Sequence, residues 1–492
     1  MITEYSKWDA TETAKKIKNK DVSAAELASH AIQLIEKWNP KLNAVVLKMY
    51  DEGKKLINEL DPQAPLYGVP FLIKDISLAY KGFPLTGSCK GMSDYVPTYD
   101  SELMLRYKKA GLIVLGKTNV PECGLKGVTD SEMRGVCRNP WNLGFTPGGS
   151  SGGSAAVVAA RIVPVAHAND GGGSIRIPAS CCGLIGLKPS RGRMPMGPEV
   201  GESWMGQVAD HVVTRSVRDS ALLLDLTHGS DPGSPYTAPQ FSGLYTQSIE
   251  QPFKKMRIAY SFKSLYGKQT HAECKKALEH SIELCKGLGH ELVEKDLAIN
   301  QQEMVRAYMT IVAASMAAEM REIERQFGKV LGPNDMELPT WILVLLGRAL
   351  QAGELAHAVY LSRKAGRALG QFFDQHDFFM LPTMAYPPTA IGELDFSIVK
   401  KGLMQVLKTV PHRKLLLTAL DQIVEESFEK IPNTELFNQT GLPAISVPLF
   451  WGKNNLPIGT QFVSAYGRED QLLWIARELE KANPWVDKFP LE

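Results

Sequence analysis

Apolar and polar residues recur along the chain with the spacings of both helices and strands. Residues 20–38 place Leu27 and Ile35 on one helical face, and Ser23 and Glu26 have the spacing of a capping box at its start. Pro40 is predicted to end this helix, because the residue before a proline is disfavoured in helical geometry. The same period predicts helices over 102–111, 216–229, 270–288, 301–327 and 471–482, and over the first half of 155–169.

Short apolar runs bounded by turn residues predict strands between these helices. They cover 42–49, 67–80, 112–119, 257–261, 377–388, 443–449 and 457–465, with one more after Pro164. Because strands and helices alternate, the predicted class is α/β around a mostly parallel central sheet.

Composition narrows the classes of protein without naming one. The 492 residues are 44% hydrophobic and carry a net charge of +2, so charge gives no reason to expect a nucleic-acid partner. The longest apolar run, 155–168, contains Arg161 and Pro164 and is too short to span a bilayer, so no membrane association is expected. The N-terminus has no signal-peptide pattern, and seven scattered cysteines predict reduced thiols in a cytoplasmic protein. No metal-binding motif occurs, so no metal or other cofactor is expected.

Two glycine-serine loops, 147–154 and 170–174, carry the candidate chemistry. Such loops are usually turns. The first lacks the Gly-Lys-Ser/Thr ending of a phosphate-binding loop. It formally matches Gly-x-Ser-x-Gly, the motif of a nucleophile elbow, with Ser151 as the nucleophile. That motif needs a preceding strand and a partner histidine, but the residues ahead of it make a poor strand and the sequence around each histidine does not mark it as a partner.

The second loop has the composition of an oxyanion hole. Gly171, Gly172 and Gly173 leave backbone N–H groups unobstructed beside Ser174, which is the natural nucleophile. Its base could be Lys74, which lies among apolar residues. A lysine on a strand is usually at the surface, but a buried one has a lowered pKa and serves as a general base.

At these positions the sequence resembles the amidase signature family. The resemblance rests on 148–156 and 170–179, and on shorter matches at 68–70, 73–75, 116–119, 139–142, 438–444 and 457–459. It implies the amidase-signature fold, an α/β architecture with a large, mixed, mostly parallel sheet covered by helices on both faces. It also implies a single domain over 1–492, with a core at about 65–230 and 430–470 and a variable substrate-side region at about 230–430.

The resemblance assigns roles to residues of both loops. It implies a triad of Ser174 as nucleophile, Ser150 as bridging serine and Lys74 as base, with a cis peptide bond from Gly149 to Ser150. The backbone N–H groups of Gly171, Gly172, Gly173 and Ser174 would hold the oxyanion. Ser151 is expected to hydrogen-bond within the relay, and Asp170 and Arg176 either position the loop or form a purely structural ion pair. Cys123, Gly124 and Leu125 are candidates for the acyl pocket, and a helix around 304–316 for its opposing wall.

The substrate is less defined than the reaction. Segments 165–170, 180–189 and 465–470 are most similar to the 6-aminohexanoate-cyclic-dimer hydrolases of the family, which implies a small, linear or cyclic amide substrate. Two alternatives remain: the glutaminase (A) subunit of a glutamyl-tRNA amidotransferase, and a non-catalytic binding protein on the same scaffold. Members of the family are often dimers, so a homodimer is a further expectation.

Overall fold

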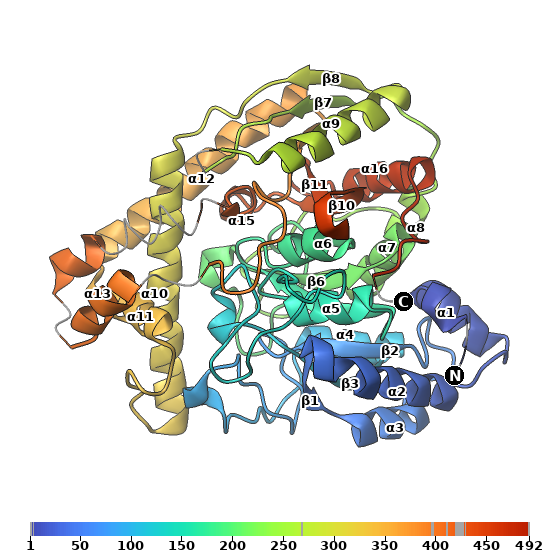
Figure 1. Ribbon diagram of the computed structural model, residues 1–492, viewed down its shortest axis with the longest axis horizontal. Coiled ribbons are helices and arrows are strands. Elements are labelled where there is room, and N and C mark those ends of the chain that lie inside the picture. The colour runs from blue at the N-terminus through green and yellow to red at the C-terminus, as the bar shows by residue number, and fades with distance from the viewer. Residues whose placement is uncertain are drawn as a thin grey trace.

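A single eleven-stranded sheet forms the centre of the molecule (Figure 1). The computed structural model describes residues 2, 4–266, 269–394, 398–409, 412–418, 428 and 430–490. The strand order is β1-β3-β2-β4-β6-β5-β10-β11-β9-β7-β8. The strands are β1 (Val45–Lys48), β2 (Pro70–Lys74), β3 (Ile113–Thr118), β4 (Val165–Asp170), β5 (Ile185–Lys188), β6 (Ala209–Thr214), β7 (Arg257–Tyr260), β8 (Glu291–Glu294), β9 (Phe378–Pro382), β10 (Ala444–Trp451) and β11 (Pro457–Val463).

Helices cover both faces of this sheet. They are α1 (Ala10–Lys18), α2 (Ala24–Leu42), α3 (Tyr50–Glu59), α4 (Glu102–Ala110), α5 (Gly152–Ala159), α6 (Arg176–Cys182), α7 (Val217–Thr227), α8 (Tyr245–Ser248), α9 (Ala272–Gly287), α10 (Gln301–Phe327), α11 (Leu338–Ala349), α12 (Ala352–Gln375), α13 (Ile398–Thr409), α15 (Glu435–Gln439) and α16 (Glu469–Ala482). The predicted α/β class and the coverage of both faces are therefore confirmed.

The sheet is mixed, and the prediction that it is mostly parallel is wrong. Parallel pairs occur where β2 meets β3 and β4, and where β7 meets β8 and β9. Between these regions the pairing is antiparallel, and β1 is also antiparallel to β3. The segment 452–456 between β10 and β11 is too short for the crossover that a parallel pair needs, so these strands form a hairpin.

Alternating side chains of β2 belong to different cores. Phe71 and Ile73 lie in the cluster that also contains apolar residues of α4, α7 and α16, whereas Leu72 lies with those of α2, α5 and α6. This alternation is the ordinary period of a strand. The next residue, Lys74, therefore belongs to the face that α5 and α6 cover.

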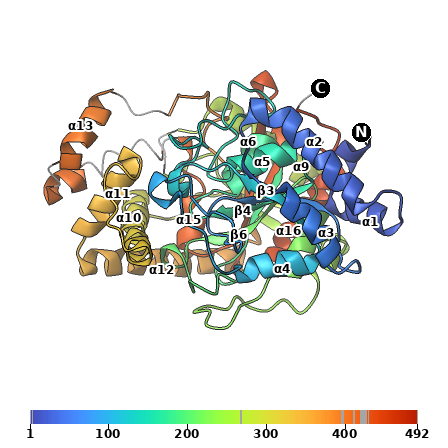
Figure 2. The ribbon, with the colours of Figure 1, turned by 90° about the horizontal axis from the view of Figure 1, so that it is seen from below.

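Helices α10 to α13 lie together at one side of the sheet, as both ribbon views show (Figures 1 and 2). A third apolar cluster joins α10 and α11 to Cys89 and Cys123 from the loops after β2 and β3. The variable region predicted at 230–430 includes these helices, and some of it lies outside the described residues. The contact brings this region next to the loops that carry the candidate site.

Two features of the helices differ from the prediction. Helix α2 continues through Pro40 to Leu42, and it ends at Asn43, which has a left-handed φ of 49°. Since Pro40 falls in the last turn, the lost N–H removes one hydrogen bond only, and the Asn39 side chain accepts from the N–H groups of Ala44 and Val45 beyond the helix. The helices without a predicted counterpart are α1, α3, α6, α8, α11, α12, α13 and α15.

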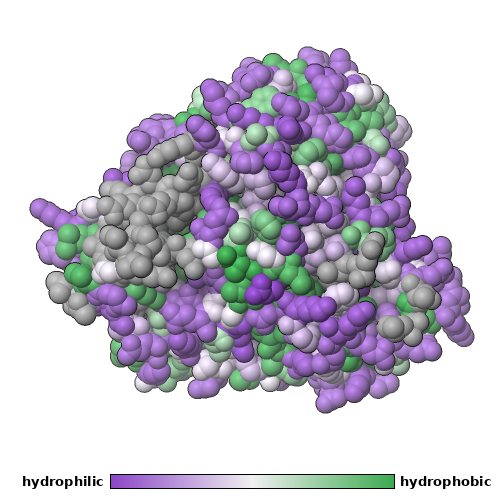
Figure 3. All heavy atoms as spheres, in the orientation of Figure 1, coloured by the Kyte–Doolittle hydropathy of each residue, from purple (hydrophilic) through white to green (hydrophobic). Residues whose placement is uncertain are grey.

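The surface in the orientation of Figure 1 is mainly hydrophilic, with small apolar areas between the polar side chains (Figure 3). Among the described residues, no single helix is both long and apolar enough to cross a membrane. Only α11 and α12 taken together reach that length and composition, and they meet at an angle of 104°.

Candidate active site

Lys74 is the last residue of β2 and its side chain has no exposure to solvent. The Nζ atom donates a hydrogen bond to Ser150 Oγ at 2.7 Å and a second one to Asn169 Oδ1. Ser150 belongs to the first glycine loop, and Asn169 directly precedes the second. The buried lysine is thus hydrogen-bonded to one residue of the first loop and to the residue that leads into the second.

Burial lowers the pKa of Lys74 to about 7, although the Asp210 and Asp170 carboxylates act in the opposite direction. Desolvation penalises the charged ammonium, and no carboxylate of the described residues contacts Nζ directly to offset the whole penalty. A substantial fraction of Lys74 is therefore neutral near pH 7. A neutral amine can accept a proton, which an ordinary surface lysine cannot do at this pH.

A second layer of hydrogen bonds holds Lys74 in place. Ser77 Oγ accepts from Asn169 Nδ2 at 3.1 Å and donates to Asp210 Oδ1 at 3.0 Å. His167 Nε2 lies 3.1 Å from the same Asp210 oxygen, while its Nδ1 accepts the backbone N–H of Lys74 at 3.4 Å. Burial lowers the pKa of His167. His167 is therefore a core residue that supports the site through Lys74 and Asp210.

The first glycine loop contains the cis peptide bond that the family resemblance implied, between Gly149 and Ser150. A Cβ atom on Gly149 would lie 2.6 Å from the backbone of Val128, so the loop passes too close to its neighbour for any side chain. Ser150 itself is 2% exposed. Close packing, together with the contact to Lys74, fixes the position of the Ser150 hydroxyl.

Ser151 is fully buried and donates a hydrogen bond to the Asn169 carbonyl at 3.2 Å. It precedes α5 but follows irregular chain, where a nucleophile elbow needs a strand. These observations argue against Ser151 as an elbow nucleophile. Its hydroxyl lies next to Asn169, a partner of Lys74, and the expected hydrogen bond of Ser151 within the relay stays a prediction.

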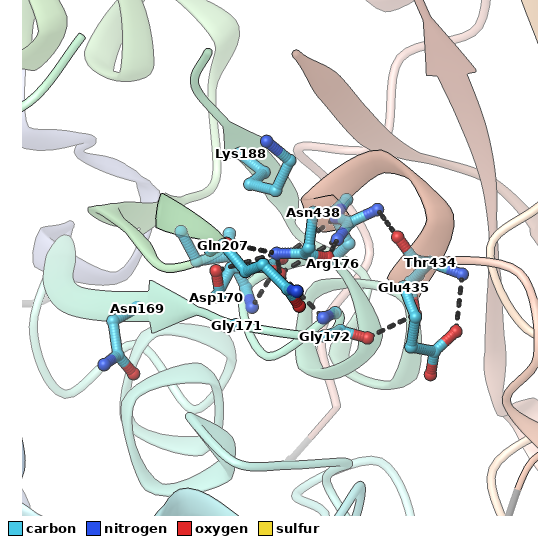
Figure 4. Close-up of polar contacts among 12 residues, drawn as sticks. Asn169, Asp170, Gly171, Gly172, Arg176, Lys188, Gln207, Thr434, Glu435 and Asn438 are labelled. Carbon is cyan, nitrogen blue, oxygen red and sulfur yellow. Dashed lines mark hydrogen bonds and ion pairs between the residues drawn. The ribbon is translucent and has the colours of Figure 1, made fainter. Parts of the chain in front are cut away.

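The second glycine loop is held by a buried ion pair. Arg176 Nη2 and Nε donate to the two oxygens of Asp170, each at 2.9 Å, and neither side chain has solvent exposure. Burial alone would raise the pKa of Asp170, but the Arg176 guanidinium outweighs it and keeps the pKa at about 2. Asn438 Nδ2 adds further bonds to Oδ1 and to the backbone carbonyl of Asp170 (Figure 4). The pair is structural and also positions the loop, so the two expected roles coincide.

Side chains from distant segments fix the carbonyls of this loop. Tyr308 on α10 donates to the Gly171 carbonyl at 3.3 Å, and Thr434 Oγ1 donates to the Gly172 carbonyl at 2.7 Å. Among the described residues, the N–H groups of Gly171, Gly172 and Ser174 have no protein acceptor. Fixed carbonyls and free amides are the arrangement that an oxyanion hole requires.

Gly173 departs from the prediction for this loop. Its N–H donates to Asp170 Oδ1 at 2.6 Å, so the carboxylate already occupies this amide and it is not a free oxyanion donor. The residue has a φ of 129°, and a Cβ atom would lie 2.3 Å from Thr434 Oγ1. Gly173 therefore gives the loop its turn, and three of the four predicted donors remain.

Ser174 is partly exposed and lies two residues before α6. Its Oγ has no hydrogen-bond partner within the described part of the chain. Apart from Gly172, the glycines on its N-terminal side are buried. Ser174 is thus the serine of the two loops whose hydroxyl is both reachable and uncommitted.

Of the three predicted acyl-pocket residues, Gly124 lies directly beside Ser150. A Cβ atom on Gly124 would lie 3.2 Å from Ser150 Oγ, and Gly124 has a φ of 69°. Cys123 is buried in the cluster that includes α10, and Leu125 is half-buried against it. The location fits a pocket wall, while the role of these three residues stays a prediction.

Several residues at the site were not singled out from the sequence. These are Ser77, Asn169, Asp210, Tyr308, Thr434, Glu435 and Asn438. Asn438 belongs to a segment that carried the family resemblance, which could have drawn attention to it. Asn169 lies in the segment 165–170 that also carried a resemblance, and Tyr308 lies in the helix expected around 304–316. The remaining four come from segments far apart in the chain, and no local pattern marks them.

Comparison with known proteins agrees with this geometry. The Amidase family model matches residues 26–473. The 6-aminohexanoate-cyclic-dimer hydrolase of Paenarthrobacter ureafaciens is 36% identical over 489 residues, covering 98% of this chain and 96% of the relative. A solved structure of 6-aminohexanoate cyclic dimer hydrolase complexed with substrate has a TM-score of 0.91 at 34% identity, covering 99% of both chains. A bacterial aryl acylamidase has a TM-score of 0.84 at 27% identity, covering 97% of this chain and 96% of that one.

The chain belongs to the amidase family. It is an enzyme of the class that hydrolyses amide C–N bonds, as the family match and the relatives support. The resemblance to the amidase signature, which rested mainly on the two glycine loops, is confirmed, as is the resemblance to the 6-aminohexanoate-cyclic-dimer hydrolases, which rested on 165–170, 180–189 and 465–470.

Proposed function

We propose that this enzyme hydrolyses small amides through an acyl-enzyme on Ser174, with Ser150 and Lys74 as its proton relay. The single observation that carries the proposal is the buried contact of Lys74 Nζ with Ser150 Oγ at 2.7 Å, together with a pKa of Lys74 near 7. It supplies a base where no histidine is in place to act as one.

In the proposed reaction, Ser174 Oγ attacks the amide carbonyl while its proton passes to Ser150, whose own proton passes to neutral Lys74. The carbonyl oxygen becomes an oxyanion against the N–H groups of Gly171, Gly172 and Ser174. Collapse of this intermediate breaks the C–N bond, and the leaving nitrogen takes a proton back from Lys74 through Ser150. Water then attacks the Ser174 ester by the same relay, which releases the acid and restores the free enzyme.

The substrate we propose is a small linear or cyclic amide. The curated relative and the solved structure that this chain matches are both named for the cyclic dimer of 6-aminohexanoate. Gly124, which has no side chain to fill the space beside Ser150, supports a pocket that admits an acyl chain.

We also propose a cytoplasmic homodimer, as expected from the sequence, and light scattering on purified protein tests the dimer.

The test is hydrolysis of a panel with the 6-aminohexanoate cyclic dimer, linear primary amides, anilides and glutamine. We expect turnover of small amides by wild type, a loss of about a thousandfold or more in Ser174→Ala, and no change in the exposed control Ser93→Ala. Ammonia release from glutamine alone would favour the amidotransferase-subunit alternative. An unchanged rate in Ser174→Ala would contradict the proposed mechanism.

A further inference from the structure

Glu435 is a buried carboxyl group beside the glycine loop that the proposed mechanism does not use. It is the first residue of α15 and is 4% exposed. A Cβ atom on Gly172 would lie 3.5 Å from Glu435 Cγ, so this side chain lies against the loop two residues before Ser174. A buried carboxyl at this position needs a partner or a function.

The Glu435 carboxyl has no cation of its own. The salt bridges of the described residues include none to Glu435. The nearby Arg176 guanidinium directs its N–H groups to Asp170, Thr434 O, Gln461 Oε1 and Asn438 Oδ1. The guanidinium is therefore committed elsewhere, and Glu435 contacts only backbone donors.

One oxygen of Glu435 remains available. Oε2 accepts the Thr434 N–H at 3.2 Å, while Oε1 has no hydrogen-bond partner among the described residues. Figure 4 shows the carboxyl group pointing away from the Asp170–Arg176 pair. The free oxygen is thus separate from the structural ion pair, while Cγ of the same side chain lies next to Gly172.

The groups around Glu435 favour its neutral form. Burial raises the pKa of Glu435 to about 8, with Arg176 lowering it and Asp170 raising it. Tyr308 and Tyr266 also face it, and burial raises the pKa of both phenols well above the usual value, so neither carries charge. Below pH 8 most of Glu435 is a carboxylic acid, whose O–H is a hydrogen-bond donor.

We propose that the Glu435 carboxylic acid donates a hydrogen bond to an acceptor oxygen of the bound substrate, and that it thereby selects amides that carry a second carbonyl group. This inference rests on the proposed function, because it needs the scissile carbonyl to lie against Gly172. With one carbonyl there, the side chain of Glu435 is placed to meet a second oxygen farther along the same molecule.

The test compares adipamide with hexanamide. Both are linear six-carbon primary amides, and only adipamide has a second carbonyl. The ratio of their kcat/KM values cancels the titration of Lys74, since both substrates use the same base. We measure this ratio between pH 6 and 9.5 for wild type, Glu435→Gln and Glu435→Leu.

Wild type should prefer adipamide, and the preference should fall as pH rises through about 8 and the carboxyl group loses its proton. Glu435→Gln keeps an N–H donor that does not titrate, so its preference should persist at high pH. Glu435→Leu should lower the ratio about tenfold, mainly through KM for adipamide.

The matched control is Glu480→Gln on α16. Burial also raises the pKa of Glu480, but this residue contacts Val217 and Arg477 away from both glycine loops. It should leave the ratio and its pH dependence unchanged. A ratio that is the same in wild type, Glu435→Gln and Glu435→Leu overturns the inference while the amidase activity itself stands. Wild type that hydrolyses neither amide and resists a fluorophosphonate at Ser174 overturns the proposed function and this inference with it.

Discussion

Lys74 Nζ and Ser150 Oγ lie 2.7 Å apart in a region from which solvent is excluded, with Lys74 at the end of a central strand and Ser150 at a cis peptide bond. The two residues are 76 positions apart in the chain. The strand fixes one partner and close loop packing fixes the other, so the contact is maintained by the fold. Its chemistry follows from burial, which makes the amine a base.

The pH dependence of activity follows from this burial. The mechanism requires neutral Lys74, and a pKa of about 7 means that the ammonium form dominates at lower pH. On a monoamide substrate, kcat/KM should therefore rise with pH through about 7 and level off above it. A rate that rises only toward pH 10 would show that Lys74 keeps its ordinary pKa.

Lys74 should also lower the stability of the protein. Between pH 7 and 10.5 the unfolded chain binds a proton at Lys74 that the folded chain has largely lost, so its contribution to stability becomes less unfavourable as pH rises. Lys74→Met, which removes the buried amine, should abolish activity and raise Tm relative to wild type more at pH 7 than at pH 9.5. Thermal unfolding at the two pH values measures this difference. A larger gain at pH 9.5 would contradict the buried-base account.

Gly124 and Gly82 provide a matched pair for testing the pocket. Both have left-handed φ values, 69° and 80°, so alanine strains the backbone in each. A Cβ atom would lie 3.2 Å from Ser150 Oγ at Gly124 and would meet nothing within 4 Å at Gly82. Each alanine variant should destabilise the protein by about 1 kcal/mol, and only Gly124→Ala should also lose activity, by about tenfold or more.

Chemical denaturation and kcat/KM measured on the same samples separate these effects. Equal losses of activity in both variants would mean that backbone strain alone is responsible. In that case Gly124 would have no special position beside Ser150.

Local patterns predicted much of this fold because most of its elements are amphipathic or bounded by strong turn signals. The capping box at Ser23 and the strand ending at Lys74 are examples. The strand directions could not be predicted, because alternating helices and strands do not specify how β6 and β10 pair with distant neighbours. Helices α11 and α12 follow one another with a single break, and no motif in that region marks them.

The candidate site also has some residues that the sequence marks and some contacts that only the fold reveals. Lys74, Ser150 and Ser174 lie in segments whose residue types and spacing carry the family resemblance, so the sequence was enough to propose them. The contacts of Asn169 with Lys74 and of Glu435 with Gly172 became visible only when the fold brought these residues together. The occupation of the Gly173 amide by Asp170 depends on the loop conformation, which composition alone does not specify.

The most direct test of the central claim is to locate the nucleophile by fluorophosphonate labelling, intact mass spectrometry and peptide mapping. The experiment uses wild type, Ser174→Ala and Ser151→Ala at pH 8, where most of Lys74 is neutral. We expect a single adduct on Ser174 in wild type, its disappearance in Ser174→Ala and its retention in Ser151→Ala. An adduct on Ser151, or undiminished labelling in Ser174→Ala, would contradict the assignment of Ser174 as nucleophile.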